Sequence, residues 1–208
     1  MDNLDRIKRL LIYKNLLCQM QNLGFVKVFS DNIADALDIS SSLVRKDFAF
    51  FGIVGSQKGG YDIVTILGKI NEILGKNQVQ KVIVIGVGRL GSAFLRYGKG
   101  FTDEGIKIVA GFDVDPSIID PNADPPVLLI SNLSEFIKTN SIHIAIVAVP
   151  EASARHTIDL LKSEGILGIL NFTSLKIKST EETIINHVNI EHELARLIYA
   201  VNNRRQVS

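Results

Sequence analysis

Apolar residues in the first third of the chain recur at helical spacing. The pattern from Leu4 to Met20 predicts one amphipathic helix that ends at Gly24. A second, shorter helix is expected to begin at the N-cap Ser30 and to end near Ile39. The chain therefore opens with helices that carry their apolar residues on one inward face.

A serine cluster at 40–42 predicts the start of a third helix, because serine hydroxyls can cap free backbone N–H groups. The buried side of this helix would carry Val44, Phe48 and Phe51, and Gly52 would end it. The second and third helices are separated by about four residues, which is typical of a helix-turn-helix.

A glycine-rich segment follows Gly52. Two short extended pieces joined by this segment predict a hairpin with Lys58 at its tip, and a hairpin beside a helix-turn-helix is a wing. Asp62 is then expected to cap a further helix that runs to Leu74. The periodicity breaks at 75–78, where we place a linker.

Beyond the linker, strand and helix patterns alternate, which predicts a parallel sheet with helices on both faces. The expected strands are 81–85, 106–112, 127–130, 142–149, 166–170 and 183–188, and the expected helices are 89–97, 133–138, 152–163 and 190–201, with an irregular stretch at 113–126. The predicted fold class is α/β, with an N-terminal winged helix-turn-helix domain and a C-terminal Rossmann-like domain. The predicted domains are 1–77, 78–189 and a closing helix and tail at 190–208.

The clearest chemical motif lies at 81–91. A run of β-branched residues suits a buried strand, and a Gly-x-Gly-x-x-Gly turn follows it and opens a helix. Gly86 permits the sharp turn, Gly88 lets a pyrophosphate approach the backbone, and Gly91 lets the helix pack closely on the strand. The phosphates would lie at the N-terminus of the helix, against free N–H groups.

An acidic residue, Asp113, ends the expected second strand, 22 residues after Gly91. Its carboxylate would accept hydrogen bonds from both ribose hydroxyls and would repel a 2′-phosphate, so we expect NAD⁺ and NADH as cofactors. Dinucleotides in this fold lie along the carboxyl ends of the strands. Val149 and Pro150 close the fourth expected strand at that edge. The predicted cofactor-binding residues are Gly86, Val87, Gly88, Arg89, Leu90, Gly91, Asp113, Val114, Val149 and Pro150. The alternative is a glycine-rich turn that holds no ligand.

The third helix carries a basic pair, Arg45 and Lys46, in its first turns and away from its apolar stripe. A recognition helix presents such residues to the major groove, and the wing tip can reach a phosphate or the minor groove. The predicted DNA-binding residues are Ser40, Ser42, Arg45, Lys46, Lys58, Gly59, Gly60 and Tyr61. The alternative is a small helical subdomain whose basic pair is a solvated face.

Composition adds mainly exclusions. The formal net charge is +1, so the DNA hypothesis depends on motif geometry and not on bulk charge. No apolar run approaches the length of roughly 18 residues that spans a bilayer, and no signal-peptide pattern occurs, so we expect a cytoplasmic protein. Cys18 is the only cysteine, which excludes an internal disulfide and a cysteine-based metal site. We expect Cys18 to be a buried small hydrophobe more than a reactive thiol.

The rival hypothesis is an NAD-dependent oxidoreductase. Such an enzyme needs a substrate pocket and an acid or base beside the nicotinamide, and no separate substrate domain follows the nucleotide fold. The four histidines, His143, His156, His187 and His192, share no spacing with carboxylates that indicates a metal site or a relay. His143 is expected in the core or at a sheet edge, and His187 and His192 in solvent. We therefore expect no catalytic residue and no metal.

Several motifs together make this chain similar to Rex, the redox-sensing transcriptional repressor family of bacteria. They are 42–48 with Phe51-Gly52, Gly59-Gly60-Tyr61, the turn 86–91, Phe112-Asp113-Val114-Asp115-Pro116, Ala148-Val149-Pro150 and 165–172. The resemblance implies a homodimer that binds a palindromic operator with NAD⁺ or no cofactor and releases it with NADH. It also implies that the closing helix is exchanged between subunits.

The resemblance assigns further roles. Phe172 matches a segment near the nicotinamide, and Tyr97 matches a tyrosine that takes part in the redox-dependent rearrangement. Family members commonly pair an arginine of the first helix with an acidic residue before the closing helix, and the matching positions here are Asn15 and Asn189. We therefore expect a weakened or differently wired response to NADH. A dinucleotide held permanently as a structural ligand is the remaining alternative.

Overall fold

The chain divides into two compact units, Met1–Gln78 and Val79–Ser208, in the computed structural model. The structure describes residues 3–56, 59–76, 78–102 and 104–207. Together the two units give an α/β protein with a helical N-terminal unit and a Rossmann-like C-terminal unit.

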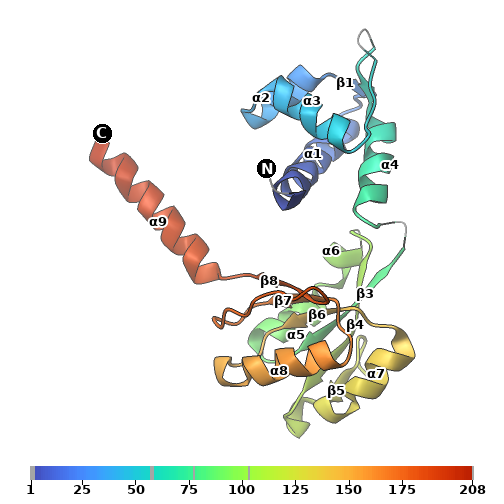
Figure 1. Ribbon diagram of the computed structural model, residues 1–208, viewed down its shortest axis with the longest axis vertical. Helices are drawn as coiled ribbons and strands as arrows, with labels where there is room; N and C mark the ends of the chain where they lie inside the picture. The colour runs from blue at the N-terminus through green and yellow to red at the C-terminus, as the bar shows by residue number, and fades with distance from the viewer. Residues whose placement is uncertain (1–2, 57–58, 77, 103, 208) are drawn as a thin grey trace. The chain divides into compact units, whose positions relative to one another are not determined.

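The N-terminal unit is a helix-turn-helix with a wing (Figure 1). Its helices and strands are α1 (Asn3–Asn22), β1 (Lys27–Val28), α2 (Ser30–Leu37), α3 (Ser41–Phe50), β2 (Tyr61–Asp62) and α4 (Ile63–Ile73). The turn between α2 and α3 contains Asp38 in the left-handed conformation, with φ 53°. Asp62 caps α4 by accepting a hydrogen bond from the Thr65 N–H at 2.8 Å, as predicted.

The four helices of this unit share one core. Its fully buried members come from every helix: Leu10, Tyr13, Leu17, Ile33, Val44, Phe48, Ile63 and Ile70. The ring of Phe48 meets the rings of Tyr13 and Tyr61 edge to face, at centroid distances of 5.7 and 5.0 Å. Phe48 therefore joins α1, α3 and the wing in one cluster, and Cys18 packs half-buried against the same core.

Two local predictions for this unit need correction. The N-cap of α2 is Phe29 and not Ser30, because the Asn32 side chain accepts the Phe29 N–H at 3.0 Å and Ser30 is already helical. The second arm of the wing pairs antiparallel with β1, a strand that the sequence pattern did not indicate. Among the described residues of the wing, its first arm is bridged through Ser56 and Gly60, and the predicted tip residue Lys58 lies outside the described residues.

The C-terminal unit is built on a parallel sheet of six strands in the order β5-β4-β3-β6-β7-β8 (Figure 1). The strands are β3 (Gln80–Ile85), β4 (Ile106–Asp113), β5 (Val127–Leu129), β6 (Ile144–Val147), β7 (Gly168–Asn171) and β8 (Ile184–His187). The helices are α5 (Arg89–Arg96), α6 (Gly98–Thr102), α7 (Leu133–Asn140), α8 (Glu151–Ser163) and α9 (Ile190–Val207), with short 3-10 turns η1 (Pro116–Ile118) and η2 (Ile130–Asn132).

Alternate residues of β3 supply the two faces of the sheet. Ile83 and Ile85 belong to the core that contains α7 and α8, whereas Val82 and Val84 belong to the core that contains α5. The near-continuous apolar run of β3 is thus explained by burial on both faces. The order of the strands reverses beside β3, so its carboxyl end lies at the point where such folds bind ligands.

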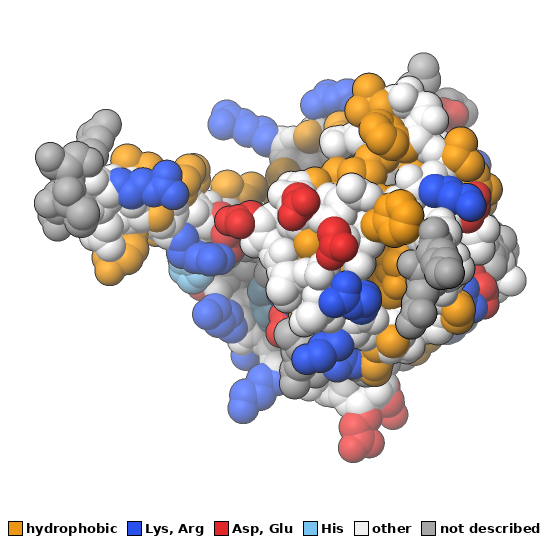
Figure 2. Space-filling model, turned by 90° about the horizontal axis from the view of Figure 1, so that it is seen from above, with side chains coloured by type: hydrophobic (Ala, Val, Ile, Leu, Met, Phe, Trp, Pro, Cys, Tyr) orange, Lys and Arg blue, Asp and Glu red, His pale blue; other side chains and the backbone are white. Residues whose placement is uncertain are grey.

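The closing helix α9 runs to Val207, six residues beyond the expected end at 201. Every side chain of α9 that the structure describes as far as Arg204 is exposed. Its exposed large apolar residues are Ile190, Leu194, Leu197, Ile198, Tyr199 and Val201. On the arm at the left of Figure 2, hydrophobic side chains lie beside Lys and Arg side chains. The short helix α6 was not predicted, because its Gly-Lys-Gly sequence resembles a loop.

Candidate DNA-binding surface and nucleotide site

The helix α3 presents its basic pair to solvent. Ser40 caps the helix by accepting the Leu43 N–H at 3.3 Å. Arg45 and Lys46 are exposed, as are Ser40 and Ser42, whereas the stripe that includes Val44 and Phe48 is buried. The first turns of α3 therefore have the arrangement that a helix reading a DNA groove requires.

The guanidinium of Arg45 is held by its neighbours. Its Nη1 donates to the Ser30 hydroxyl at 3.0 Å and to the Ser41 hydroxyl at 3.2 Å. The carboxylate of Asp31 lies 3.8 Å from the same nitrogen. Arg45 is thus directed by the first turn of α2, a contact that sequence reasoning did not foresee.

A buried polar network fixes α3 against α1. Arg9 donates from Nε and Nη2 to the two carboxylate oxygens of Asp47 at 2.6 and 2.7 Å, and the Tyr13 hydroxyl donates to Asp47 at 2.8 Å. Burial alone would raise the pKa of Asp47, but these hydrogen bonds outweigh it and lower the pKa below 3.8. Burial and Asp47 together raise the pKa of Tyr13. Asp47 therefore stays ionised and holds α3 in place.

A pocket of about 290 Å³ lies between α2, α3 and the wing. Arg45, Gly60 and Tyr61, all predicted to bind DNA, help to line it. Gly60 has φ +65°, and a Cβ there would lie 2.7 Å from the Val28 carbonyl oxygen. Glycine is therefore required at this turn. The predicted Gly59 donates its N–H to the Ser56 hydroxyl at 2.7 Å.

A second pocket, of about 90 Å³, opens at the carboxyl ends of β3, β4 and β6. It brings together five of the predicted cofactor-binding residues: Gly86, Asp113, Val114, Val149 and Pro150. Arg89 and Leu90 lie in the exposed first turn of α5. The pocket therefore lies at the carboxyl edge of the sheet, beside β3, where the order of the strands reverses.

The glycines of the turn have distinct roles. A Cβ on Gly91 would lie 1.8 Å from the Gly86 carbonyl oxygen, so α5 can pack this closely only with glycine there. Gly86 has φ +90°. A Cβ on Gly88 would meet nothing within 4 Å, so glycine at that position has no packing reason. Gly88 is also the N-cap of α5 and supplies no side-chain cap, which leaves the first N–H groups without a side-chain acceptor.

Asp113 does more than face the pocket. One carboxylate oxygen accepts the Val87 N–H at 2.6 Å, and the other accepts the N–H groups of Val114 and Asp115 at 2.7 and 3.0 Å. The carboxylate thus clamps the glycine-rich turn to the end of β4. This clamp was not predicted, because sequence spacing does not show which backbone groups meet a side chain.

Phe172 and Tyr97 are not among the residues that line that pocket. Phe172 packs on Phe94 of α5 at 4.9 Å, and Tyr97, 63% exposed at the end of α5, packs edge to face on Phe101 at 5.3 Å. The neighbouring Asn171 is fully buried, and its amide donates to the Leu175 carbonyl at 2.9 Å.

The histidine predictions need correction at two positions. His143 is exposed, because β6 begins only at the next residue. His187 is half-buried, with Nδ1 3.0 Å from the Asn171 amide nitrogen and Nε2 2.8 Å from the Ile177 carbonyl oxygen. His187 is therefore a structural residue of the β8 edge and not a solvated one. His192 is exposed, as expected.

The two asparagines at the expected switch positions lie in different units. Asn15 is exposed on α1. Asn189 accepts the His192 N–H at 2.8 Å and so caps α9. Its side chain therefore has a local role in starting the closing helix.

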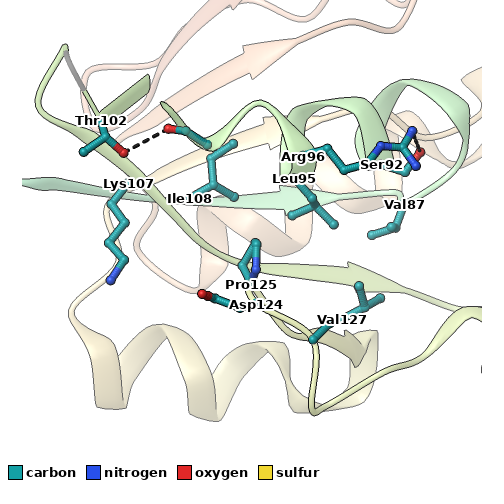
Figure 3. A pocket seen from close by; sticks show the side chains of 12 residues that line it. Val87, Ser92, Leu95, Arg96, Thr102, Lys107, Ile108, Asp124, Pro125 and Val127 are labelled. Carbon is teal, nitrogen blue, oxygen red and sulfur yellow. Dashed lines mark hydrogen bonds between the residues drawn. The ribbon is translucent and has the colours of Figure 1, made fainter. Parts of the chain in front are cut away.

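A larger cavity, about 600 Å³, lies beside α5 and the loop 120–126 (Figure 3). It shares only Val87 with the predicted cofactor-binding residues. In this view Lys107 lies at the left, Asp124 lies near the middle beside Pro125, and Arg96 lies beside Ser92 at the right. The smaller pocket is the better nucleotide site, because it contains the turn and the acidic residue.

Within residues 3–56, 59–76, 78–102 and 104–207, no group of three or more His, Cys, Asp or Glu could hold a metal ion. In the same ranges, no helix has the length and apolar character needed to span a membrane.

The N-terminal unit has the winged helix-turn-helix fold that is common in DNA-binding domains, and the C-terminal unit has a Rossmann-like fold with a glycine-rich turn. The two folds together define a class of two-domain proteins that combine a DNA-binding fold with a nucleotide-binding fold. Residues 6–49 match the family described as putative DNA-binding protein N-terminus, and residues 77–175 match the CoA binding domain family. The redox-sensing transcriptional repressor Rex of Listeria welshimeri is 34% identical over 94% of this chain and 91% of its own. Rex 1 of Enterococcus faecalis is 31% identical over 96% and 93%. The chain belongs to the Rex family of redox-sensing transcriptional repressors.

Solved structures agree with this family. The crystal structure of RSP in complex with β-NAD⁺ and operator DNA has a TM-score of 0.92 and 26% identity, and covers 100% of this chain and 95% of its own. RSP in complex with β-NADH has a TM-score of 0.86 and 25% identity, and covers 100% and 97%. RSP is described as a Rex-family repressor, as are the Listeria and Enterococcus relatives, so the family speaks against the oxidoreductase hypothesis.

Proposed function

We propose that this chain is a DNA-binding repressor that senses the ratio of NADH to NAD⁺. It binds operator DNA with NAD⁺ or without a cofactor and releases the DNA when NADH is bound. The observation that carries the proposal is the likeness, over the whole chain, to a repressor solved with β-NAD⁺ and operator DNA. The proposal places the protein in the cytoplasm, with the DNA it regulates.

The residues of the nucleotide pocket fit the cofactor. The open space at Gly88 and the uncapped N-terminus of α5 suit a pyrophosphate, which the helix dipole would stabilise. The Asp113 carboxylate faces the pocket. Three backbone N–H groups already occupy its oxygens, two on Oδ1 and one on Oδ2, so Oδ2 keeps one lone pair for a ribose hydroxyl. The cofactor would supply the redox signal through its nicotinamide ring, while these residues bind and orient it.

The closing helix supports a homodimer. Its six exposed apolar residues need a partner surface, since large apolar patches are rarely left in water. A dimer gives the switch a physical basis, because NADH shifts the population toward whichever arrangement of the subunits binds it better. A weakened response to NADH is the second candidate, because Asn15 and Asn189 carry no charge and Asn189 is engaged as a helix cap.

Lys46→Ala is expected to weaken operator binding about tenfold and to leave NADH affinity unchanged. Lys46 is exposed on α3 and contributes nothing to the core, so its loss removes one cationic contact with DNA. Arg45→Ala should act in the same direction. Anisotropy of labelled operator and fluorescence titration of NADH measure the two affinities. An equal loss of both would mean that these residues support the fold and do not bind DNA.

Asp113→Ala is expected to lower NADH affinity by at least about tenfold and to relax the rejection of NADPH. The change removes the ribose acceptor and the charge that repels a 2′-phosphate, and it also releases the Val87 N–H. Asp113→Asn keeps an acceptor for that N–H and is the matched control. If NADH keeps its advantage over NADPH in both variants, Asp113 is not in the ribose site.

A further inference from the structure

The first turn of α2 carries an acidic residue where a DNA-binding surface would be expected to be basic. Asp31 follows the first residue of α2, and its side chain is 72% exposed. It lines the pocket of about 290 Å³ between α2, α3 and the wing, together with Arg45 and Tyr61. A DNA phosphate that approached Arg45 through this pocket would therefore meet a carboxylate.

Asp31 also acts directly on the recognition arginine. Its Oδ1 lies 3.8 Å from the Arg45 Nη1, the same atom that donates to Ser30 and Ser41. Two hydroxyls and one carboxylate thus direct Arg45 into a single arrangement. Because both charged side chains are more than half exposed, this pair contributes little to folding stability, and its placement needs another reason.

We propose, on the basis of the DNA-binding function proposed above, that Asp31 is a specificity-determining residue. Its charge competes with phosphates for Arg45 and repels the backbone of any duplex, which weakens binding to non-operator DNA. On operator DNA the same contact has a compensating effect, because it directs Arg45 in advance toward the groove. The residue therefore widens the affinity ratio between operator and other DNA instead of raising affinity.

The test is Asp31→Asn in the full chain, with anisotropy of a labelled palindromic operator and of a scrambled duplex of equal length at fixed salt. We expect affinity for the scrambled duplex to rise about fivefold, the effect of roughly one screened charge at close range. Affinity for the operator should change less than twofold, so the specificity ratio falls. Asp31→Ser is a second neutral variant that keeps a residue favoured in the first turn of a helix.

Asp35→Asn is the matched control, since it makes the same change in net charge on the same helix at another exposed position. In an Arg45→Ala background the effect of Asp31→Asn should become smaller. Equal gains on both duplexes, or the same result with Asp35→Asn, would overturn the role of Asp31. If the unmodified protein does not prefer operator over scrambled DNA, the proposed function itself fails, which is a separate outcome.

Discussion

Asp47→Ala is expected to abolish operator binding and to lower the free energy of unfolding of the N-terminal unit by about 3 kcal/mol, the lower end for a broken buried ion pair. Asp47 is 1% exposed and accepts three short hydrogen bonds from Arg9 and Tyr13. Its loss removes the acceptor that α1 uses to hold α3. Urea unfolding followed by circular dichroism measures stability, and Asp35→Ala is the surface control.

The same network predicts a pH dependence. The pKa of Asp47 is lowered in the folded protein, so its ionised form contributes stability at pH values above its ordinary pKa of 3.8. That stability is lost as the pH falls below 3.8 and through the folded pKa. The stability difference between the unmodified protein and Asp47→Ala should therefore shrink in acid. A difference that stays constant from pH 7 to about pH 3 would mean that charge is not what Asp47 contributes.

Gly88→Ala is expected to leave thermal stability unchanged and to lower NADH affinity by at least about thirtyfold, because a methyl group would occupy the place of the pyrophosphate. In the folded chain the added Cβ meets nothing within 4 Å, and the φ of −66° lies outside the left-handed region that favours glycine. Differential scanning fluorimetry and isothermal titration with NADH give the two quantities.

Gly91→Ala provides the contrast. There the added Cβ would lie 1.8 Å from the Gly86 carbonyl oxygen, so α5 must shift and stability should fall with affinity. The two variants separate a glycine kept for the ligand from a glycine kept for packing. If Gly88→Ala binds NADH normally, the turn does not hold a pyrophosphate.

Much of the fold follows from local pattern. Helical spacing located α1 to α4, and the alternation of apolar strands with amphipathic helices predicted the parallel sheet. The errors lie where a segment is short or its partner is distant. β1 has two residues and exists because β2 pairs with it. Ser30 looked like a cap, but the Asn32 side chain shifts the cap to Phe29.

The candidate sites also combine features that the sequence pattern implies with contacts that it could not reveal. The glycine turn and Asp113 meet because parallel strands end at a common edge, which the sequence pattern already implies. The bond from Val87 to Asp113 and the contacts of Arg9, Tyr13 and Asp47 join residues 26 to 38 positions apart, so periodicity could not reveal them. His187 was expected in solvent because it flanks the closing helix, whereas the buried Asn171 provides it with a partner.

The central claim is that cofactor state controls binding to DNA. Its most direct test is fluorescence anisotropy of a labelled palindromic operator, titrated with protein at one fixed salt concentration, without cofactor, with NAD⁺ and with NADH. We predict tight binding without cofactor and with NAD⁺, and release by NADH. Operator binding that is equally tight in all three conditions would contradict it and would favour a nucleotide held as a permanent structural ligand.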